Sequence, residues 1–265
     1  MPRPLAFLIA LALGLMAVGS AGIALPLDDI RFTLDLSRDH AEVRLTLNDA
    51  RDKGRKGDHH SSSDYPVSDL AGLKPDWARG GPVSFALVRD AGRVDCAGTA
   101  RAAHAEGTCR FTADRGLSDL LAASGMARPT EEEAYAMTLI GVRRALLDAL
   151  IAGHYPMPGI DDFIAMSAVG VTPDFLRELA ATGYARLEPE QLIQMAALRI
   201  DPAFIRGFER IGYKNLPVET LVQLRALDVT PQFVELVRRD SMGDLSIDQL
   251  VKLKVIGFRP AAAAH

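Results

Sequence analysis

The first half of the chain alternates between hydrophobic and polar residues in short runs. Large apolar side chains recur at every second position in Ile30–Leu36, in Ala41–Leu47 and in Pro82–Val88. Such alternation is typical of half-buried β-strands, because successive side chains of a strand point to opposite faces of the sheet. Together with two further runs, the pattern predicts a small antiparallel β-domain of about five strands over residues 28–116.

These two further runs each contain one cysteine. Cys96 lies in the alternating segment Arg93–Gly98 and Cys109 in Gly107–Phe111, with a polar, turn-like stretch from Arg101 to Gly107 between them. This arrangement predicts a β-hairpin in which both thiols point to the same face. In an oxidising compartment the two are expected to form a disulfide. Two buried free thiols are the alternative, whereas a metal or redox site is disfavoured because the pair lacks CxxC spacing.

One long polar segment interrupts the predicted strands. Residues 49–64 read DARDKGRKGDHHSSSD and contain almost no apolar side chain, which predicts a mobile loop in solvent. Its four basic side chains could contact an acidic partner, although a charged run of this kind is usually only solvated. The adjacent His59 and His60 are a poor basis for a metal site, because neighbouring side chains diverge and no third ligand lies close in the sequence.

The hydrophobic period changes after residue 116. A linker with a short helix is expected over residues 117–130. From residue 131 onward, apolar residues recur at intervals of three and four, as they do in amphipathic helices. We therefore expect an α+β protein in two parts, with an all-helical domain over residues 131–260.

Within this second part the sequence repeats itself every 29 residues. The segment Val171–Phe175 recurs as Ile200–Phe204 and again as Val229–Phe233. A short fixed period is the signature of stacked supersecondary units. The units start near residues 142, 171, 200 and 229, and the first of them is degenerate.

Each unit contains two predicted helix starts, which are recognised from capping chemistry. The first is a threonine or aspartate N-cap followed by proline, and it occurs at Thr172, Asp201 and Thr230. The second has a hydrophobic staple across its first turn, and it falls near Glu188, Pro217 and Ser246. Two helices this short cannot bury both apolar stripes alone, so neighbouring units are expected to stack as a solenoid of αα-hairpins.

The first 24 residues have the pattern of an export signal. Arg3 precedes an apolar run from Leu5 to Met16, and small residues at Ala21 and Ala24 offer two imperfect cleavage sites. The stretch Leu5–Leu25 is also long enough to cross a bilayer, so a retained inner-membrane anchor is an open alternative, as is a buried amino-terminal helix. Export predicts a periplasmic or secreted location, where a disulfide persists.

Composition and charge narrow the classes of function. The chain of 265 residues is 48% hydrophobic and 24% charged, which is the composition of a globular protein. Its net charge of −4 and isoelectric point near 5.9 provide no general attraction for phosphate backbones, so nucleic acid is not an expected partner. After residue 24 no GxSxG, HExxH, Walker or GxGxxG motif occurs, and none of the six histidines pairs convincingly with a nucleophile. The sequence therefore predicts no enzymatic activity and no cofactor.

Two stretches are similar to parts of known bacterial regulators. The units VTPDFLRELAATGYARLEPEQLIQMAALR and IDPAFIRGFERIGYKNLPVETLVQLRALD resemble the helical repeats appended to some proteins related to the BlaR1 and MecR1 antibiotic-sensing regulators. The segment GPVSFALVRDAGRVDCAGTARAAHAEGTCRFTADRGLSDLL resembles the β-segment that can precede those repeats, and together they cover most of residues 82–258. The resemblance implies the architecture but no peptidase or sensor activity, because the HExxH motif and several membrane spans of those regulators have no counterpart here.

Three candidate functions follow from these features. We expect the solenoid to present an extended face to an unidentified protein or peptide, and the candidate interaction surface is the row Tyr155, Tyr184 and Tyr213. The same tyrosines would otherwise pack helix ends with their hydroxyls in water. A self-associating structural component of the envelope is one alternative. The other is an envelope-acting hydrolase whose site at the domain junction would use Glu131, Glu132 and Glu133, although a solvated helix N-terminus explains these glutamates better.

Overall fold

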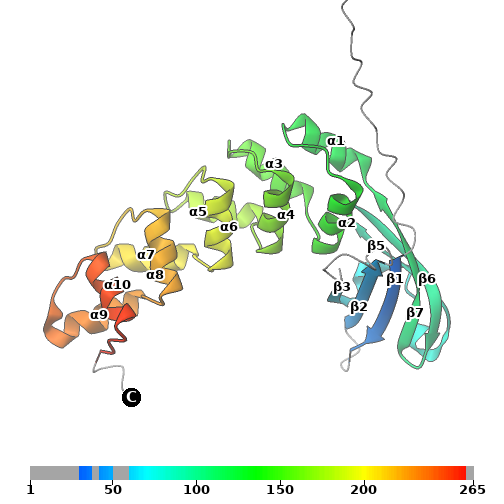
Figure 1. The fold of residues 1–265 in the computed structure, drawn as a ribbon, viewed down its shortest axis with the longest axis horizontal. Helices are drawn as coiled ribbons and strands as arrows, with labels where there is room; N and C mark the ends of the chain where they lie inside the picture. Colours follow the sequence, from blue (N-terminus) through cyan, green and yellow to red (C-terminus); the bar gives the residue numbers. More distant parts are fainter. Residues whose placement is uncertain (1–29, 38–41, 50–59, 261–265) are drawn as a thin grey trace, which may run out of the picture.

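The chain folds into a sheet followed by a series of helices. The computed structural model describes residues 30–37, 42–49 and 60–260, and Figure 1 shows an arc of helices leading away from a curled sheet. The two-part α+β layout predicted from the change of hydrophobic period is therefore present. The predicted amino-terminal signal over residues 1–24 and residues 50–59 of the predicted loop lie outside the described residues.

Seven antiparallel strands form one sheet in the described part of the chain. Their order across the sheet is β3-β2-β1-β7-β6-β5-β4. Their bounds are β1 Ile30–Leu36, β2 Glu42–Asp49, β3 His60–Pro66, β4 Leu70–Ala71, β5 Gly81–Arg89, β6 Gly92–Arg101 and β7 His104–Ala113. The five predicted strands correspond to β1, β2, β5, β6 and β7, so the two edge strands β3 and β4 are additions.

The predicted loop over residues 49–64 is wrong at both ends, because β2 continues to Asp49 and the polar run from residue 60 onward forms β3. β3 lies at the edge of the sheet, where one neighbouring strand pairs with its backbone and most of its side chains stay in solvent. An edge strand therefore needs little hydrophobic content, and β3 is anchored by the buried Tyr65. Arg44 of β2 donates two hydrogen bonds of 2.9 Å to the Asp64 carboxylate, which lowers the pKa of that carboxyl.

The cysteine hairpin turns within two residues rather than over the predicted stretch from Arg101 to Gly107. β6 and β7 stay paired up to Arg101 and His104, and Ala102 and Ala103 form the turn with φ angles of 47° and 67°. Both values lie in the left-handed region, which is the geometry of a type I′ turn. The sequence signal for such a turn is Asn-Gly, and two alanines provide none. The pattern therefore placed the turn too broadly.

Replacing this turn by Ala102→Asn/Ala103→Gly is expected to raise the free energy of unfolding by about 1–2 kcal/mol. L-residues such as alanine are strained in the left-handed region, whereas Asn-Gly adopts a type I′ turn readily. A urea titration of both proteins measures the difference. The opposite change, Ala103→Val, places a β-branched side chain at a φ of 67° and is expected to destabilise the protein. A neutral or stabilising Ala103→Val would contradict the turn geometry.

Ten α-helices follow the sheet within the described residues. Their bounds are α1 Arg115–Ala123, α2 Glu131–Ile140, α3 Arg144–Ala152, α4 Ile160–Ala168, α5 Pro173–Ala180, α6 Pro189–Ala197, α7 Pro202–Arg210, α8 Val218–Ala226, α9 Pro231–Val237 and α10 Ile247–Val255. The starts of α2, α4, α6, α8 and α10, which we call the even helices, lie 29 residues apart. The starts of α3, α5, α7 and α9, the odd helices, have the same spacing.

The predicted capping hydrogen bonds are present at the starts of α5, α7, α9 and α10, whereas Pro217 before α8 makes none through its side chain. The N-cap side chains accept hydrogen bonds from the backbone N–H three residues later, at 3.1, 2.8 and 3.1 Å for Thr172, Asp201 and Thr230. The even helices α6, α8 and α10 begin directly after Glu188, Pro217 and Ser246. Ser246 also forms a capping box with Gln249. Local chemistry therefore sets where these helices start.

Helix ends recur in the same register. One residue at the end of each even helix has a φ angle between 52° and 87°. It is the C-cap itself in α2 and the residue after the C-cap in the others, and these residues are Gly141, Gly170, Arg199, Asp228 and Gly257. Gly183 and Gly212, the predicted stops of α5 and α7, have φ angles of 90° and 99°. After α9 the pattern changes, since residues 238–242 form a short π-helix instead. The last odd helix thus ends differently from the others.

Two hydrophobic cores meet at α2. One core lies against the sheet, and α2 contributes Ala134, Tyr135 and Leu139 to it. The Tyr135 ring lies 5.3 Å from the ring of Phe111 on β7, centroid to centroid. The other core runs through the helices and includes Met137 from the opposite side of α2. One helix therefore belongs to both parts of the protein.

The predicted linker over residues 117–130 packs as part of the helical core. Leu117 and Leu121 of α1 are buried in that core together with Ala91 from the turn between β5 and β6. In addition, the Asp90 carboxylate accepts a hydrogen bond of 2.8 Å from the backbone N–H of Arg144, at the start of α3. The sheet and α1 thus cover the amino-terminal end of the helices.

Candidate interaction surfaces

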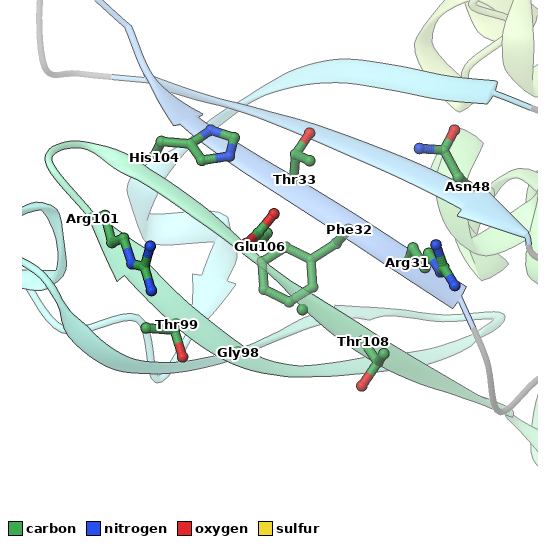
Figure 2. Close-up of a pocket in the computed structure, with 11 residues that line it drawn as sticks. Arg31, Phe32, Thr33, Asn48, Gly98, Thr99, Arg101, His104, Glu106 and Thr108 are labelled. Carbon is green, nitrogen blue, oxygen red and sulfur yellow. The ribbon is translucent and has the colours of Figure 1, made fainter.

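The outer face of the sheet carries a groove of about 610 Å³ over β1, β6 and β7 (Figure 2). Arg31, Arg101 and Glu106 line it, so its charges are of both signs, and all three side chains are exposed. His104 also lines it, and its Nδ1 lies 2.7 Å from the Asp35 carboxylate. The sequence pattern does not reveal this groove, although alternation in β1 places Arg31 on the face opposite the buried core. Exposed mixed charges of this kind do not define a ligand class.

Two glycines shape the floor of this groove. Gly98 of β6 and Gly107 of β7 face each other in register. A Cβ atom on Gly107 would lie only 2.2 Å from the carbonyl oxygen of Ala97 and 2.8 Å from the ring of Phe32. Only glycine permits so close an approach of the two strands. The pair thereby shapes the outer face where the groove lies.

The predicted tyrosine row connects neighbouring helices and loops through its hydroxyls. Tyr184 and Tyr213 each donate a hydrogen bond to the carbonyl oxygen of the leucine 32 residues further on, at 2.5 Å for Tyr184. Tyr155 is buried, and its hydroxyl donates to the carbonyl oxygen of Leu176 at 3.3 Å. Burial raises the pKa of the Tyr155 and Tyr184 hydroxyls, which keeps them protonated as donors. These hydroxyls bind backbone carbonyl oxygens, and a role for the row in partner recognition stays a prediction.

Two cationic side chains also recur one unit apart. Arg225 on α8 lies over the ring of Phe204, and Lys254 on α10 lies over the ring of Phe233, at 5.1 and 4.6 Å from the ring centroids. Arg225 additionally donates a hydrogen bond of 2.9 Å to the carbonyl oxygen of Leu198, at the end of α6. A cation is favourable at a helix C-terminus and over an aromatic ring. Through these contacts the two cations stabilise the packing of neighbouring helices.

A row of exposed carboxylates follows the even helices. The second residue of each even helix is acidic and exposed, and these residues are Glu132, Asp161, Glu190, Glu219 and Asp248. Because α2 contacts α4, α4 contacts α6 and α6 contacts α8, the row runs along one edge of the helical part. A carboxylate in the first turn also stabilises its own helix through the helix dipole. We call these five residues the acidic row. Extending the 29-residue register of the sequence would have revealed it.

The three glutamates proposed at the junction form the first turn of α2. The Glu133 carboxylate accepts a hydrogen bond of 2.6 Å from the backbone N–H of Thr130, and the Thr130 hydroxyl accepts one of 3.2 Å from the backbone N–H of Glu133. This capping box uses Glu133 to start the helix. Across the described ranges no group of three or more His, Cys, Asp or Glu side chains could hold a metal ion. His59 lies outside those ranges.

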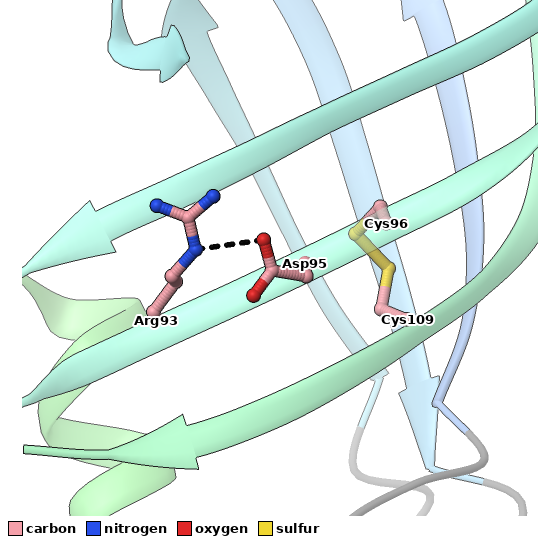
Figure 3. Close-up of a disulfide and its surroundings, with 4 residues drawn as sticks. All are labelled: Arg93, Asp95, Cys96 and Cys109. Atoms are coloured by element: carbon pink, nitrogen blue, oxygen red, sulfur yellow. Dashed lines mark hydrogen bonds and ion pairs between the residues drawn. A yellow bond between two sulfur atoms is a disulfide. The ribbon is translucent and has the colours of Figure 1, made fainter. Parts of the chain in front are cut away.

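The two cysteines form the predicted disulfide. Cys96 of β6 and Cys109 of β7 face each other in register, with their sulfur atoms 2.00 Å apart (Figure 3). Both side chains are buried in the core of the sheet. On the opposite face of β6, Arg93 donates a hydrogen bond of 2.7 Å to Asp95. The crosslink therefore ties the two longest strands together at the centre of the sheet.

Comparison of the chain with models of known families, with curated proteins and with solved structures finds no match. The resemblance to repeats appended to BlaR1- and MecR1-related proteins consequently stays a prediction. Of the helices in the described residues, none is long and apolar enough to cross a membrane.

Proposed function

We propose that the chain is a non-catalytic interaction scaffold of the bacterial envelope. In this proposal residues 131–258 form a solenoid of helix pairs, which displays equivalent side chains at regular intervals to a protein or peptide partner. The supporting observation is that both series of helices start at intervals of 29 residues and share one hydrophobic core. Stacked units of this kind characteristically offer extended binding surfaces.

The proposed location is the periplasm or the exterior of the cell. The buried disulfide supports an oxidising compartment, because glutathione and thioredoxin keep most cytosolic thiols reduced. The predicted signal over residues 1–24 would provide export, with either cleavage or retention as an anchor. Sequencing the amino terminus of the protein purified from cells distinguishes the two.

Binding is proposed ahead of catalysis because of the chemistry at the junction. Glu133 is engaged in the capping box of α2, and three carboxylates in a first turn are expected from the helix dipole alone. An envelope-acting hydrolase is the weaker alternative. The hydrolase hypothesis predicts that the protein turns over an envelope polymer and that Glu131→Ala/Glu132→Ala/Glu133→Ala abolishes this turnover. The scaffold hypothesis predicts no turnover by either protein.

Neutralising part of the acidic row is expected to weaken partner retrieval about tenfold, since three charges at an interface contribute roughly 1.4 kcal/mol together. The variant is Asp161→Asn/Glu190→Gln/Glu219→Gln, used as bait with envelope extracts and compared with the unaltered chain by quantitative mass spectrometry. The matched control, Asp148→Asn/Glu178→Gln/Glu235→Gln, removes the same charge from exposed positions on the odd helices.

The outcomes separate the parts of this proposal. Retrieval that both triple variants preserve equally would exclude the acidic row as the binding face. A folded, unaltered chain that retrieves no specific partner would contradict the scaffold itself. Circular dichroism of each variant shows whether the helices remain formed, since the acidic row also supports helix starts.

A further inference from the structure

One register of the helical repeat places a cation over an aromatic ring in two successive units. The third residue of α7 and of α9 is a phenylalanine, and the eighth residue of the following even helix lies over its ring. The pairs are Arg225 with Phe204 and Lys254 with Phe233. Both phenylalanines are buried, with exposed fractions of 8% and 7%. A cation from the chain itself therefore forms part of the cover of each ring.

Each of these cations also contacts an acceptor at the carboxyl end of the preceding even helix. Arg225 donates a hydrogen bond of 2.9 Å to the carbonyl oxygen of Leu198, which follows α6. The Lys254 ammonium lies 3.2 Å from the carboxylate of Asp228, just after α8. Aromatic faces and the carboxyl ends of helices both favour positive charge. The register therefore forms a cation site from one ring and one acceptor.

The preceding unit, which contains α5 and α6, has the ring of this site without the cation. Phe175 is the third residue of α5, whereas the eighth residue of α6 is Ala196. Among the described residues no cation lies over the Phe175 ring, and its side chain is partly exposed. The carbonyl oxygen of Val169, which corresponds to that of Leu198, accepts no hydrogen bond from the described part of the chain. Ring and acceptor are therefore both open to another molecule.

A cation satisfies both parts of this site. A guanidinium or an ammonium group donates hydrogen bonds to a carbonyl oxygen and lies favourably over a ring. A neutral apolar side chain would cover the ring but leave the oxygen without a donor. Asp174, next to Phe175, is paired with Arg177 at 2.7 Å, so this pair adds no net charge. The ring and the carbonyl oxygen of Val169, at the carboxyl end of α4, therefore set the preference for a cation.

We propose that Phe175 and the carbonyl oxygen of Val169 bind a basic side chain, arginine or lysine, of a partner polypeptide. The incoming cation takes the position that Arg225 and Lys254 occupy in the next two units. It lies over the ring and donates a hydrogen bond to the carbonyl oxygen. The inference rests on the scaffold proposal for the partner. The site itself is separate from the acidic row, which lies at the amino-terminal ends of the even helices.

The test is an NMR titration of the purified protein, with isotope-labelled phenylalanine rings, by the peptide Ac-Gly-Gly-Arg-Gly-Gly-NH2. The Phe175 ring signals are expected to shift and to saturate with a dissociation constant of about 1–10 mM, as one cation–π contact and one charged hydrogen bond provide. The control peptide contains citrulline, the neutral isostere of arginine. It is expected to bind at least about tenfold more weakly, because it lacks the charge that the ring attracts.

Two substitutions close and open the site within the repeat. Ala196→Arg provides a cation from α6 and is expected to weaken binding of the arginine peptide at Phe175 at least about tenfold. Arg225→Ala removes the chain's own cation and is expected to make the Phe204 ring respond to the peptide. The matched control for the first is Ala197→Arg, which adds the same charge at the next, exposed position of α6. At physiological salt it is expected to change binding by less than about threefold.

Three results would overturn the proposal. The first is a Phe175 ring that does not respond to the arginine peptide at about 50 mM. The second is equal binding of the arginine and citrulline peptides. The third is an equal effect of Ala196→Arg and Ala197→Arg, which would indicate charge repulsion alone. Circular dichroism and unchanged Phe233 ring signals show that each variant remains folded. None of these results depends on partner retrieval, so failure of the cation site is distinguishable from failure of the scaffold.

Discussion

Phe208→Ala is expected to lower the free energy of unfolding by about 3–5 kcal/mol. The Phe208 side chain on α7 is 1% exposed, and its ring lies 5.1 Å from that of Phe204 and 6.3 Å from that of Tyr213, centroid to centroid. Truncation removes these contacts and leaves a cavity in the helical core, which the surrounding helices can only partly fill. The measurement is urea unfolding followed by far-ultraviolet circular dichroism.

The position of Phe208 makes a second effect measurable. α7 lies between α5 and α9, so the substitution weakens the packing that joins the carboxy-terminal helices to the rest. The chain has one tryptophan, Trp77, which is buried in the core of the sheet and reports on that part alone. We expect the helical signal of Phe208→Ala to be lost at lower urea than the Trp77 fluorescence.

The control for this prediction is Ile151→Ala on the exposed side of α3. Ile151 is 43% exposed, so its truncation is expected to change the free energy of unfolding by no more than about 0.5 kcal/mol. A Phe208→Ala protein that matched this control in its urea midpoint, with coincident signals, would contradict the shared helical core.

The helix starts could be predicted from the sequence because capping chemistry is local. Thr172 and Asp201 each stand before a proline, and the hydrogen bond that they accept comes from a backbone N–H three residues away. Nothing distant in the chain is needed to form it. The strand β1 was predictable for a similar reason, since alternation in Ile30–Leu36 records its buried and exposed faces directly.

The features that escaped prediction depend on distant partners. β3 is polar and is held by pairing with β2, and the left-handed turn at Ala103 is held from both sides. The backbone N–H of Ala103 donates to the carbonyl oxygen of Ala78 at 3.0 Å, and its own carbonyl oxygen accepts from Leu36 at 3.1 Å. Such tertiary contacts offset the local strain of the turn. Because these contacts join residues that are far apart in the chain, a local sequence pattern does not indicate them.

The candidate surfaces, too, were predictable only in so far as they depend on local sequence. The spacing of Tyr184 and Tyr213 is visible in the sequence, but the backbone carbonyl that each hydroxyl binds is set by how one unit packs on the next. Exposure at the end of α10 is likewise set by packing. Leu253 and Phe258 are of ordinary core residue types, but they are partly exposed, whereas Leu224 and Val229, 29 residues earlier, are buried.

Cys96→Ala/Cys109→Ala is expected to lower the free energy of unfolding by about 3 kcal/mol. The disulfide joins residues separated by 13 positions, and a crosslink over a loop of this size restricts the unfolded chain by roughly that amount. Both side chains are buried, at 4% and 2% exposure, so the loss of the sulfur atoms also leaves a small void in the sheet core. The measurement is the urea midpoint from Trp77 fluorescence.

A reducing agent provides the internal control for this disulfide. Dithiothreitol is expected to lower the midpoint of the unaltered protein toward that of the double variant, and to leave the variant itself unchanged. Because α2 packs against β6 and β7 and also contributes to the helical core, the helical signal of the double variant should also move to lower urea. Equal midpoints for the oxidised protein and the variant would show that the crosslink adds no stability. A sheet signal that shifts alone would show that α2 does not couple the two cores.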